Sequence, residues 1–313
     1  MNVCFDIRKI DFQASDKPVV TLGSFDGVHI GHQAIIKRLI EKSKEKNSMG
    51  VVVTYEPHPQ SVVASCNVPL LLTTLEERLK LFEELGVEET VVMNFDDELR
   101  EYSAEEFVDR ILVRKLKVGY LVVGDDHAFG KDRAGRVDLL KKVASEYNFH
   151  LEVIPALHVD GTRVSSTRIR KEFEGGEFAG AKRLLGHNYP IFGTVVKGKG
   201  RGKKLDYPTL NIQTPSRKLL PKDGVYSARA QLDGKTYIGM VYIGPKPTFG
   251  DYTRSVEVHV FGLEKEVSGI RAELLVESWV RKPKKFADPE HLKDQLKSDE
   301  RKIKEMFRIG HPK

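Results

Sequence analysis

The chain has 313 residues, which is enough for two domains of ordinary size, each with its own core. Hydrophobic residues make up 40% of it, and no apolar stretch approaches the roughly 20 residues that a membrane-spanning helix needs. Two cysteines without a Cys-x-x-Cys spacing indicate neither a disulfide framework nor a thiolate zinc site. The N-terminus lacks the pattern of a secretory signal, so we expect a cytoplasmic protein that does not contact a membrane.

The net charge is +6, which raises the question of nucleic acid. Much of the excess positive charge lies in two short clusters, at 197–204 and 281–285. Such clusters suit RNA and a small polyphosphate equally well, so charge alone does not choose between these ligands.

Strand-like and helix-like segments alternate through the first half of the chain. Apolar, β-rich runs lie near 18–22, 50–55, 90–95, 119–124 and 150–154. Helical patterns lie near 32–45, 75–85, 104–116 and 136–147, and capping boxes at Thr74/Glu77 and Ser103/Glu106 start two of them. This alternation predicts a parallel sheet with helices on both faces. Ligands bind beyond the carboxyl ends of such strands, which points to the loops at 23–32, 56–60, 124–130 and 161–168.

The loop at 23–32 combines glycines, an aspartate and two histidines. It joins a strand to a helix through Gly23 and Gly27, an arrangement in which free N–H groups and the helix dipole favour an anion. His29 and His32 are three residues apart, so in a first helical turn they face the same way. The simpler alternative is a helix cap with two exposed histidines. Because glycines, an aspartate and two histidines converge here, we predict a nucleotide-handling site.

Two other loops add polar groups to the same edge of the sheet. His58 lies between two prolines, which excludes a helix interior or a central strand and leaves a rigid loop as the simpler alternative. In 163–170, Ser166 and Thr167 can cap the next helix and offer hydroxyls to a phosphate. Arginines in this segment add positive charge, with solvent exposure as the alternative reading.

The pattern changes near residues 184–193. Short alternating runs follow, with a two-residue hairpin signal at Asp233-Gly234 and with Val256, Val258 and Val260 on one strand face. Asp288-Pro289 starts a final helix whose apolar stripe comprises Leu292, Leu296, Ile303, Met306 and Phe307. These signals predict a second domain, an antiparallel barrel or sandwich with a helix packed on it.

Thr209 and Asn211 are two residues apart, so on a strand their side chains share a face. A hydroxyl and an amide oxygen are hard ligands that suit Mg²⁺ with its waters and phosphate oxygens. The alternative is a basic flexible hairpin beside an ordinary strand. Glu257 lies on the polar face of its strand, where a solvated surface glutamate is the commoner outcome.

The motifs of the first half resemble those of a known family. His29-x-Gly31-His32 resembles the (H/T)xGH signature of the nucleotidyltransferase superfamily, and 25–28 narrows the resemblance to FAD synthetases. Residues 56–59 resemble the PHP loop beside the nucleotide, and 163–170 match the (I/V)SSTxIR motif that grips ATP phosphates. The resemblance implies a Rossmann-like domain whose ATP-binding residues are Gly23, Phe25, Asp26, Gly27, His29, His32, Arg163, Ser166, Thr167 and Arg168.

The loop at 124–130 resembles the family's G-x-(D/N)-F-x-F-G loop near the flavin nucleotide, with two departures. His127 stands at the first aromatic position, and Ala128 replaces a frequent arginine. The resemblance therefore implies FMN contacts from His58, Asp126 and Phe129.

The second half resembles riboflavin kinases in its glycine-rich flap at 193–202, its PTxN motif at 208–211 and its E-x-H strand at 256–261. The resemblance implies Glu257 as the catalytic base, with Thr209 and Asn211 as Mg²⁺ ligands. It implies ATP or flavin contacts from Gly198, Gly200, Lys203, Thr209, Asn211 and Arg281. Three departures from the family pattern remove neither a proposed ligand nor the base. They are Tyr242 for asparagine, Ser268 for tyrosine and Pro283 for glutamate.

The resemblance covers essentially the whole chain and implies a bifunctional riboflavin kinase/FAD synthetase. Residues 1–187 would form the FMN adenylyltransferase and 188–313 the kinase, an α/β domain followed by a mainly β domain with a C-terminal helix. The substrates would be riboflavin, FMN and ATP, with Mg²⁺ and without nucleic acid, and a weak homo-oligomer is left open. Three alternatives are another adenylyl- or cytidylyltransferase, a flavin-sensing binding protein and, least favoured, an RNA-binding protein, because the barrel lacks an aromatic-interleaved basic face.

Overall fold

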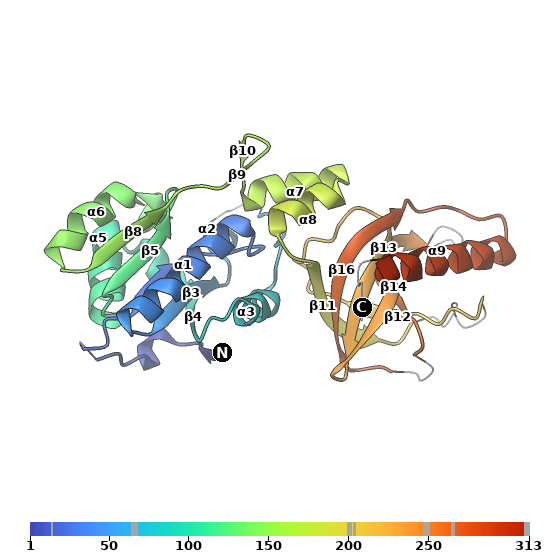
Figure 1. Cartoon of the computed structure of the whole chain (residues 1–313), viewed down its shortest axis with the longest axis horizontal. Helices are drawn as coiled ribbons and strands as arrows, with labels where there is room; N and C mark the ends of the chain where they lie inside the picture. The colour runs from blue at the N-terminus through green and yellow to red at the C-terminus, as the bar shows by residue number, and fades with distance from the viewer. Residues whose placement is uncertain are drawn as a thin grey trace. The chain divides into compact units, whose positions relative to one another are not determined.

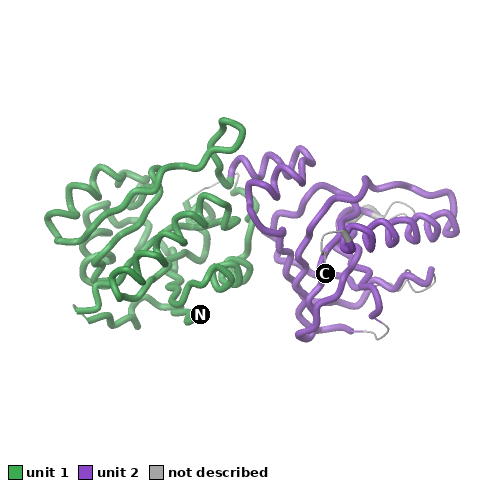
Figure 2. The backbone as a smooth tube through the Cα atoms, in the orientation of Figure 1, with its two compact units in different colours: residues 1–166 green, residues 167–313 purple. Residues whose placement is uncertain are grey.

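The computed structural model describes residues 1–13, 15–63, 68–198, 202, 205–246, 251–263 and 267–309, with the backbone alone for 246, 251–253 and 309. The chain divides into two compact units, Met1–Ser166 and Thr167–Lys313 (Figure 2). The two units are defined by how the chain packs. The predicted boundary between the two catalytic domains, after residue 187, is a different division and stays a prediction.

A six-stranded sheet, parallel throughout, forms the middle of unit 1 (Figure 1). In spatial order its strands are β1 (Asn2–Cys4), β4 (Glu89–Asn94), β3 (Gly50–Glu56), β2 (Val19–Leu22), β5 (Tyr120–Gly124) and β8 (His150–Ile154). The five strands predicted from the sequence are confirmed. β1 has three residues, too few for an apolar pattern to show, and it pairs with β4 at the edge of the sheet.

Helices cover both faces of this sheet, because alternate strand residues point to opposite sides. Val19, Val52 and Val122 pack with α1 (Ile30–Lys46) and α3 (Leu75–Glu84). Their neighbours Val20, Val51 and Leu121 pack in a second cluster with other helical segments. These are α4 (Asp97–Glu101), α5 (Ala104–Phe107), the π-helical η2 (Val108–Lys115) and α6 (Val137–Glu146).

Local signals in the sequence correctly marked the ends of several helices. Both capping boxes form, at Thr74/Glu77 and at Ser103/Glu106. Gly86 follows the last turn of α3 with φ +88°, a conformation that glycine adopts at no steric cost. The helix predicted at 104–116 is not uniform, since its α-helical turn passes into π-helix after Phe107.

The order in which the chain adds strands to the sheet reverses between β2 and β5. From β2 the chain moves to β3 and then β4, whereas from β5 it moves the opposite way to β8. In an open parallel sheet, ligands bind in the crevice at such a switch point. The loops that follow these two strands belong to two of the four segments predicted to carry function, 23–32 and 124–130.

Short elements complete unit 1 around the sheet. They are η1 (Ile7–Lys9), α2 (Pro59–Val63), η3 (Lys131–Arg133), the pair β6 (Ala128–Phe129) and β7 (Gly135–Arg136), and the pair β9 (His158–Val159) and β10 (Thr162–Arg163). β3 ends at Glu56, and α2 begins at Pro59, the second of the prolines around His58.

Unit 2 contains a closed antiparallel barrel, which decides between the two predicted architectures. Its strands run in the order β11 (Tyr189–Val196), β12 (Leu210–Gln213), β15 (Asp251–Val260), β14 (Lys235–Lys246), β13 (Gly224–Leu232) and β16 (Arg271–Arg281). The chain reaches the barrel through α7 (Ser166–Gly175) and α8 (Phe178–Leu185), and it ends in α9 (Pro289–Ile309). The rings of Phe173 on α7 and Tyr189 on β11 lie 4.5 Å apart.

The predicted barrel signals are confirmed. Asp233 and Gly234 have φ values of +47° and +73° and join β13 to β14 in a two-residue turn. Val256, Val258 and Val260 are buried, while the intervening side chains of β15 are partly exposed. On α9, Leu296, Ile303 and Phe307 pack against residues of the barrel.

Candidate active sites

The turn after β2 has a strained backbone. Phe25 and Val28, which are not glycines, have φ values of +47° and +41°, and Gly27 between them has φ +84°. Such conformations cost free energy and persist where the surroundings hold them. Phe25 is 3% exposed and makes edge-to-face contacts with His32 and Phe82, so buried aromatic packing holds the turn. Strain of this kind clusters at functional sites.

The structure brings His29 and His32 together, as their spacing predicted. His29 is the N-cap of α1, and its Nδ1 accepts a hydrogen bond from the backbone N–H of His32 at 3.3 Å. The two rings stack with their centroids 3.6 Å apart. Burial, then the neighbouring His29 and then the charge of Arg78 hold the pKa of His32 well below its ordinary value. At neutral pH His32 is therefore an uncharged imidazole that can donate or accept a hydrogen bond.

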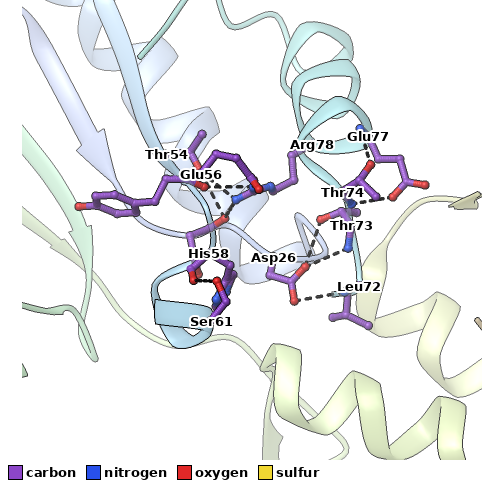
Figure 3. Close-up of polar contacts among 12 residues, drawn as sticks. Asp26, Thr54, Glu56, His58, Ser61, Leu72, Thr73, Thr74, Glu77 and Arg78 are labelled. Carbon is purple, nitrogen blue, oxygen red and sulfur yellow. Dashed lines mark hydrogen bonds and ion pairs between the residues drawn. The ribbon is translucent and has the colours of Figure 1, made fainter. Parts of the chain in front are cut away.

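Asp26 is almost fully buried and holds the turn to the segment before α3 (Figure 3). Its carboxylate accepts hydrogen bonds from the backbone N–H groups of Thr73, at 2.9 Å, and Leu72, at 3.2 Å. Its backbone carbonyl accepts another from the hydroxyl of Ser166, at 2.8 Å. Gly27 donates its N–H to the Thr73 hydroxyl at 2.8 Å. Asp26 thus fixes the turn from within, and its contact with ATP stays a prediction.

The loop around His58 is also tightly held. His58 is 6% exposed, its Nδ1 accepts a hydrogen bond from the backbone N–H of Gln60, and its carbonyl accepts one from the hydroxyl of Ser61. It follows β3, the neighbour of β2, so the two loops leave the same edge of the sheet. Gly23, at the start of the first loop, donates its N–H to Val53 on β3.

An ion pair connects the predicted flavin loop to the predicted ATP loop. Arg163, on β10, lies 2.5 Å from a carboxylate oxygen of Asp125 and 3.1 Å from one of Asp126. The guanidinium is 40% exposed, so the pair is open to solvent. The structure thus brings together Arg163 and Asp126, which the sequence assigned to different ligands.

His127, one of the two departures in the flavin loop, is partly buried, and its Nε2 is shielded from solvent. Its ring lies 5.7 Å from that of Phe129, which is itself 6% exposed. Burial lowers the pKa of His127 to about 4, so this imidazole is neutral at physiological pH.

Three of the predicted phosphate contacts lie at the start of α7. Ser166 is its first helical residue rather than its cap, and its hydroxyl binds Asp26, as described above. Thr167 and Arg168 follow in unit 2, where Arg168 lies 3.9 Å from Glu172. Their contact with ATP stays a prediction.

In unit 2 the barrel register places Asn211 beside Glu257. The two residues lie directly opposite each other on β12 and β15, and Tyr242 on β14 lies opposite Glu257 on its other side. Directly paired residues of antiparallel strands point to the same face, with Cβ atoms about 5 Å apart. The proposed metal ligand, the proposed base and one departure from the family pattern therefore form a row across three strands.

The glycine-rich segment approaches this row closely. A Cβ atom on Gly198 would lie 2.0 Å from the Nδ2 of Asn211, so a glycine is required for the observed packing. Thr209 immediately precedes β12. Gly200 and Lys203, predicted to bind ATP or flavin, lie outside the described residues.

Arg281 is engaged with a carboxylate on α9. Its guanidinium binds both oxygens of Asp299, with an Nε–Oδ1 distance of 3.1 Å and an Nη2–Oδ2 distance of 2.8 Å. Asp299 is 3% exposed and also accepts a hydrogen bond from Gln295. Arg281 therefore attaches α9 to the barrel, and its contact with a ligand stays a prediction.

Comparisons with known proteins cover both units. The FAD synthetase family model matches residues 11–168, and the riboflavin kinase family model matches residues 185–307. The chain is 34% identical over 295 residues to a bifunctional riboflavin kinase/FMN adenylyltransferase of Escherichia coli, with 94% of each chain covered. It is 37% identical over 282 residues to one of Pseudomonas fluorescens, with 90% of each covered. The chain belongs to the bifunctional riboflavin kinase/FMN adenylyltransferase family.

A solved structure shares the fold of this family member over 97% of the chain. The crystal structure of a Streptococcus pneumoniae protein, described as a macrolide-efflux protein, superposes with a TM-score of 0.83. It is 26% identical, and the match covers 97% of this chain and 98% of that one. In the part of this chain that the structure describes, each helix is too short or too polar to cross a membrane.

Sequence reasoning missed the buried groups that hold the sites of this riboflavin kinase/FMN adenylyltransferase family member. Arg78 on α3 is 1% exposed and binds Thr54 and Glu56 (Figure 3), as well as Ser24 and Tyr55. One signal was present: Arg78 lies three and four residues before the apolar Leu81 and Phe82, which puts it on the buried face of the helix. Thr73 and Asp299 carried no comparable signal.

Proposed function

We propose that the chain phosphorylates riboflavin to FMN in its second half and adenylylates FMN to FAD, with release of pyrophosphate, in its first half. The observation that carries this function is the tandem match of one chain to the FAD synthetase and riboflavin kinase models. FMN, the product of the kinase, is a substrate of the adenylyltransferase. We assign residues 1–187 to the adenylyltransferase and 188–313 to the kinase.

In the adenylyltransferase, the nucleophile is the phosphate of FMN, which is already ionised at neutral pH. The site therefore needs no general base, and its tasks are to position the two substrates and to stabilise charge on the transferred phosphorus centre. We assign these tasks to His29 and His32 and to the hydroxyls and charge at the start of α7, from Ser166, Thr167 and Arg168. A neutral His32 fits this role as a hydrogen-bond donor to a phosphate oxygen.

In the kinase, the nucleophile is a ribityl hydroxyl, whose proton must leave as the phosphoryl group arrives. Glu257 is the base that we propose, since a positioned carboxylate can accept that proton. It lies opposite Asn211 in the barrel register, and this pairing supports a base close to a proposed Mg²⁺ ligand.

The residues beside Glu257 fit a magnesium ion. Thr209 and Asn211 offer hydroxyl and amide oxygens, the hard donors that Mg²⁺ accepts while it keeps waters and phosphate oxygens. Gly198 has no side chain, and the amide of Asn211 lies in the space that a Cβ atom there would fill. The ion, when bound, offsets negative charge on the ATP phosphates.

The remaining assignments follow from this chemistry. Riboflavin, FMN and ATP are the proposed partners, and nucleic acid is not among them. The basic clusters would then meet polyphosphate. The cytoplasm supplies these substrates and is the proposed location.

The assay for this function is incubation with riboflavin, ATP and Mg²⁺, followed by chromatographic separation of FMN and FAD. The wild-type chain should form both flavins, and a wild-type chain that forms no FMN would refute the kinase assignment. The double variant His29→Ala with His32→Ala should accumulate FMN without FAD. FAD synthesis at the wild-type rate in this variant would refute the first site.

The complementary variant is Glu257→Gln, which keeps the size of the side chain and removes its basicity. It should lose FMN formation, by at least about 100-fold given the usual contribution of a general base, yet still convert supplied FMN to FAD. Kinase turnover near the wild-type rate would show that Glu257 is not the base.

A further inference from the structure

Arg78 is an ionised side chain that is buried in the core of unit 1. Its hydrogen-bond partners lie outside its own helix, α3. It projects from the middle of α3 and is 1% exposed. Desolvation lowers its pKa, against the opposing charges of Asp26, Glu56 and Glu77. Taking a guanidinium out of water is costly, and well-packed apolar residues at such positions are often as stable or more stable. Fold stability alone therefore does not account for an arginine here.

The partners of Arg78 lie where two site loops leave the sheet (Figure 3). Its Nη1 donates to the carbonyl of Ser24, at 2.5 Å, and to the hydroxyl of Thr54, at 3.0 Å. Its Nη2 donates to the carbonyl of Tyr55, at 3.2 Å, and to the carboxylate of Glu56, at 2.9 Å. Ser24 lies next to Phe25 in the turn that leads to the histidines, and Glu56 is two residues before His58. One planar group with donors in a fixed fork thus connects both loops.

The segment before α3 holds the same turn at a second point. Thr73 and Leu72 bind the carboxylate of Asp26, and the Thr73 hydroxyl accepts the N–H of Gly27. α3 and the residues before it therefore hold the strained Phe25 from both sides along the chain.

We propose that Arg78 is a positioning residue of the adenylyltransferase site. It holds the turn after β2, which leads to His29 and His32, at a fixed separation from the loop around His58. This proposal rests on the proposed function of unit 1. Among the described residues, its side chain donates hydrogen bonds to Ser24, Thr54, Tyr55 and Glu56 and none to His32, so it acts through the loops that it holds. Displacing a positioned group by about 1 Å is enough to slow a reaction by about 100-fold.

The charge of Arg78 gives a second readout. Two charged or titratable groups act on His32, namely His29 on α1 and Arg78 on α3, and both lower its pKa together with burial. The carboxylates of Asp26, Glu56 and Glu77 act on Arg78. Removing the guanidinium charge should therefore make His32 easier to protonate, which moves the acid limb of the adenylylation pH profile to higher pH.

The test compares Arg78→Met with Leu81→Ala, a variant of a buried residue on the same helix that removes only apolar packing. Arg78→Met should lower kcat/KM for FMN adenylylation about 100-fold, with the acid limb raised and riboflavin phosphorylation by unit 2 unchanged. Leu81→Ala should stay within about threefold of wild type, with an unmoved acid limb. Equal losses in the two variants at matched melting temperatures would overturn the proposal.

Two further measurements keep the proposal testable if Arg78→Met folds poorly or the chain makes no FAD. Arg78→Lys keeps the positive charge but not the planar set of donors of the guanidinium. It should therefore lower kcat/KM for FMN adenylylation without moving the acid limb of the pH profile. A wild-type kcat/KM in this variant would overturn the proposal. Amide hydrogen exchange without substrates should accelerate at 23–27 and 56–58 in either Arg78 variant but not in Leu81→Ala. Unchanged exchange there would also overturn it, whereas absence of FAD from the wild-type chain would refute only the function of unit 1.

Discussion

Replacing Gly198 with alanine tests the kinase site at a single contact. The added Cβ would lie 2.0 Å from Nδ2 of Asn211, whereas ordinary contacts begin at 3.4 Å, so the amide must move by about 1.4 Å. That amide is the end of a flexible side chain, so the shift should cost little stability. The same shift would, however, move the amide of Asn211 away from the position in which we propose that it binds Mg²⁺. We expect kcat/KM for riboflavin phosphorylation to fall about 100-fold, or about 2.7 kcal/mol of transition-state stabilisation.

The assay measures initial rates of FMN formation over a range of riboflavin and Mg²⁺ concentrations, with conversion of supplied FMN to FAD as the internal control. Gly175→Ala is the matched control, because a Cβ there would meet nothing within 4 Å. It should leave both activities unchanged. If Gly198→Ala is folded and phosphorylates riboflavin at the wild-type rate, the position of the Asn211 amide is not critical and its role as a metal ligand is refuted.

Two further predictions concern stability. The pKa of His127 is about 4 in the native chain and near 6.5 in the unfolded chain, so between these values only the unfolded chain gains the proton and the free energy of unfolding falls as pH drops. His127→Phe should reduce that slope by up to about 1.4 kcal/mol per pH unit in urea titrations of unit 1; an unchanged slope would contradict the burial argument. Asp299→Ala leaves Arg281 without its carboxylate and should destabilise unit 2 by about 3 kcal/mol. Asp294→Ala, whose pair with Lys297 is exposed, should cost under about 0.5 kcal/mol in the same denaturant titration, and equal losses would refute the role assigned to the buried pair.

Local chemistry made much of the fold predictable. The alternation of apolar strands with capped helices specified a parallel sheet, and the caps at Thr74 and Ser103 form as expected. Asp233-Gly234 specified a hairpin because both residues tolerate positive φ. The choice between barrel and sandwich was not predictable, since it depends on whether β11 and β16 pair to close the sheet, a contact between strands about eighty residues apart.

The candidate sites were predictable in part, for the same reason. Motif residues such as His29 and His32 could be found because three-residue spacing at a helix start brings side chains together locally. The pairing of Asn211 with Glu257 was not, because the register between β12 and β15 comes from the closed barrel. Nor was the ion pair of Arg163 with Asp125, which joins loops from distant parts of the chain.

By itself the sequence determined the elements, the two kinds of domain and the residues that carry chemistry, because these follow from short-range spacing and side-chain type. Tertiary structure alone decided what holds those residues in place. The turn at 23–32 owes its position to Arg78 and Thr73, about fifty residues further along the chain. α9 likewise owes its attachment to Asp299. Most buried polar groups have a hydrogen-bond partner wherever the fold provides one, and sequence distance gives no guide to that partner.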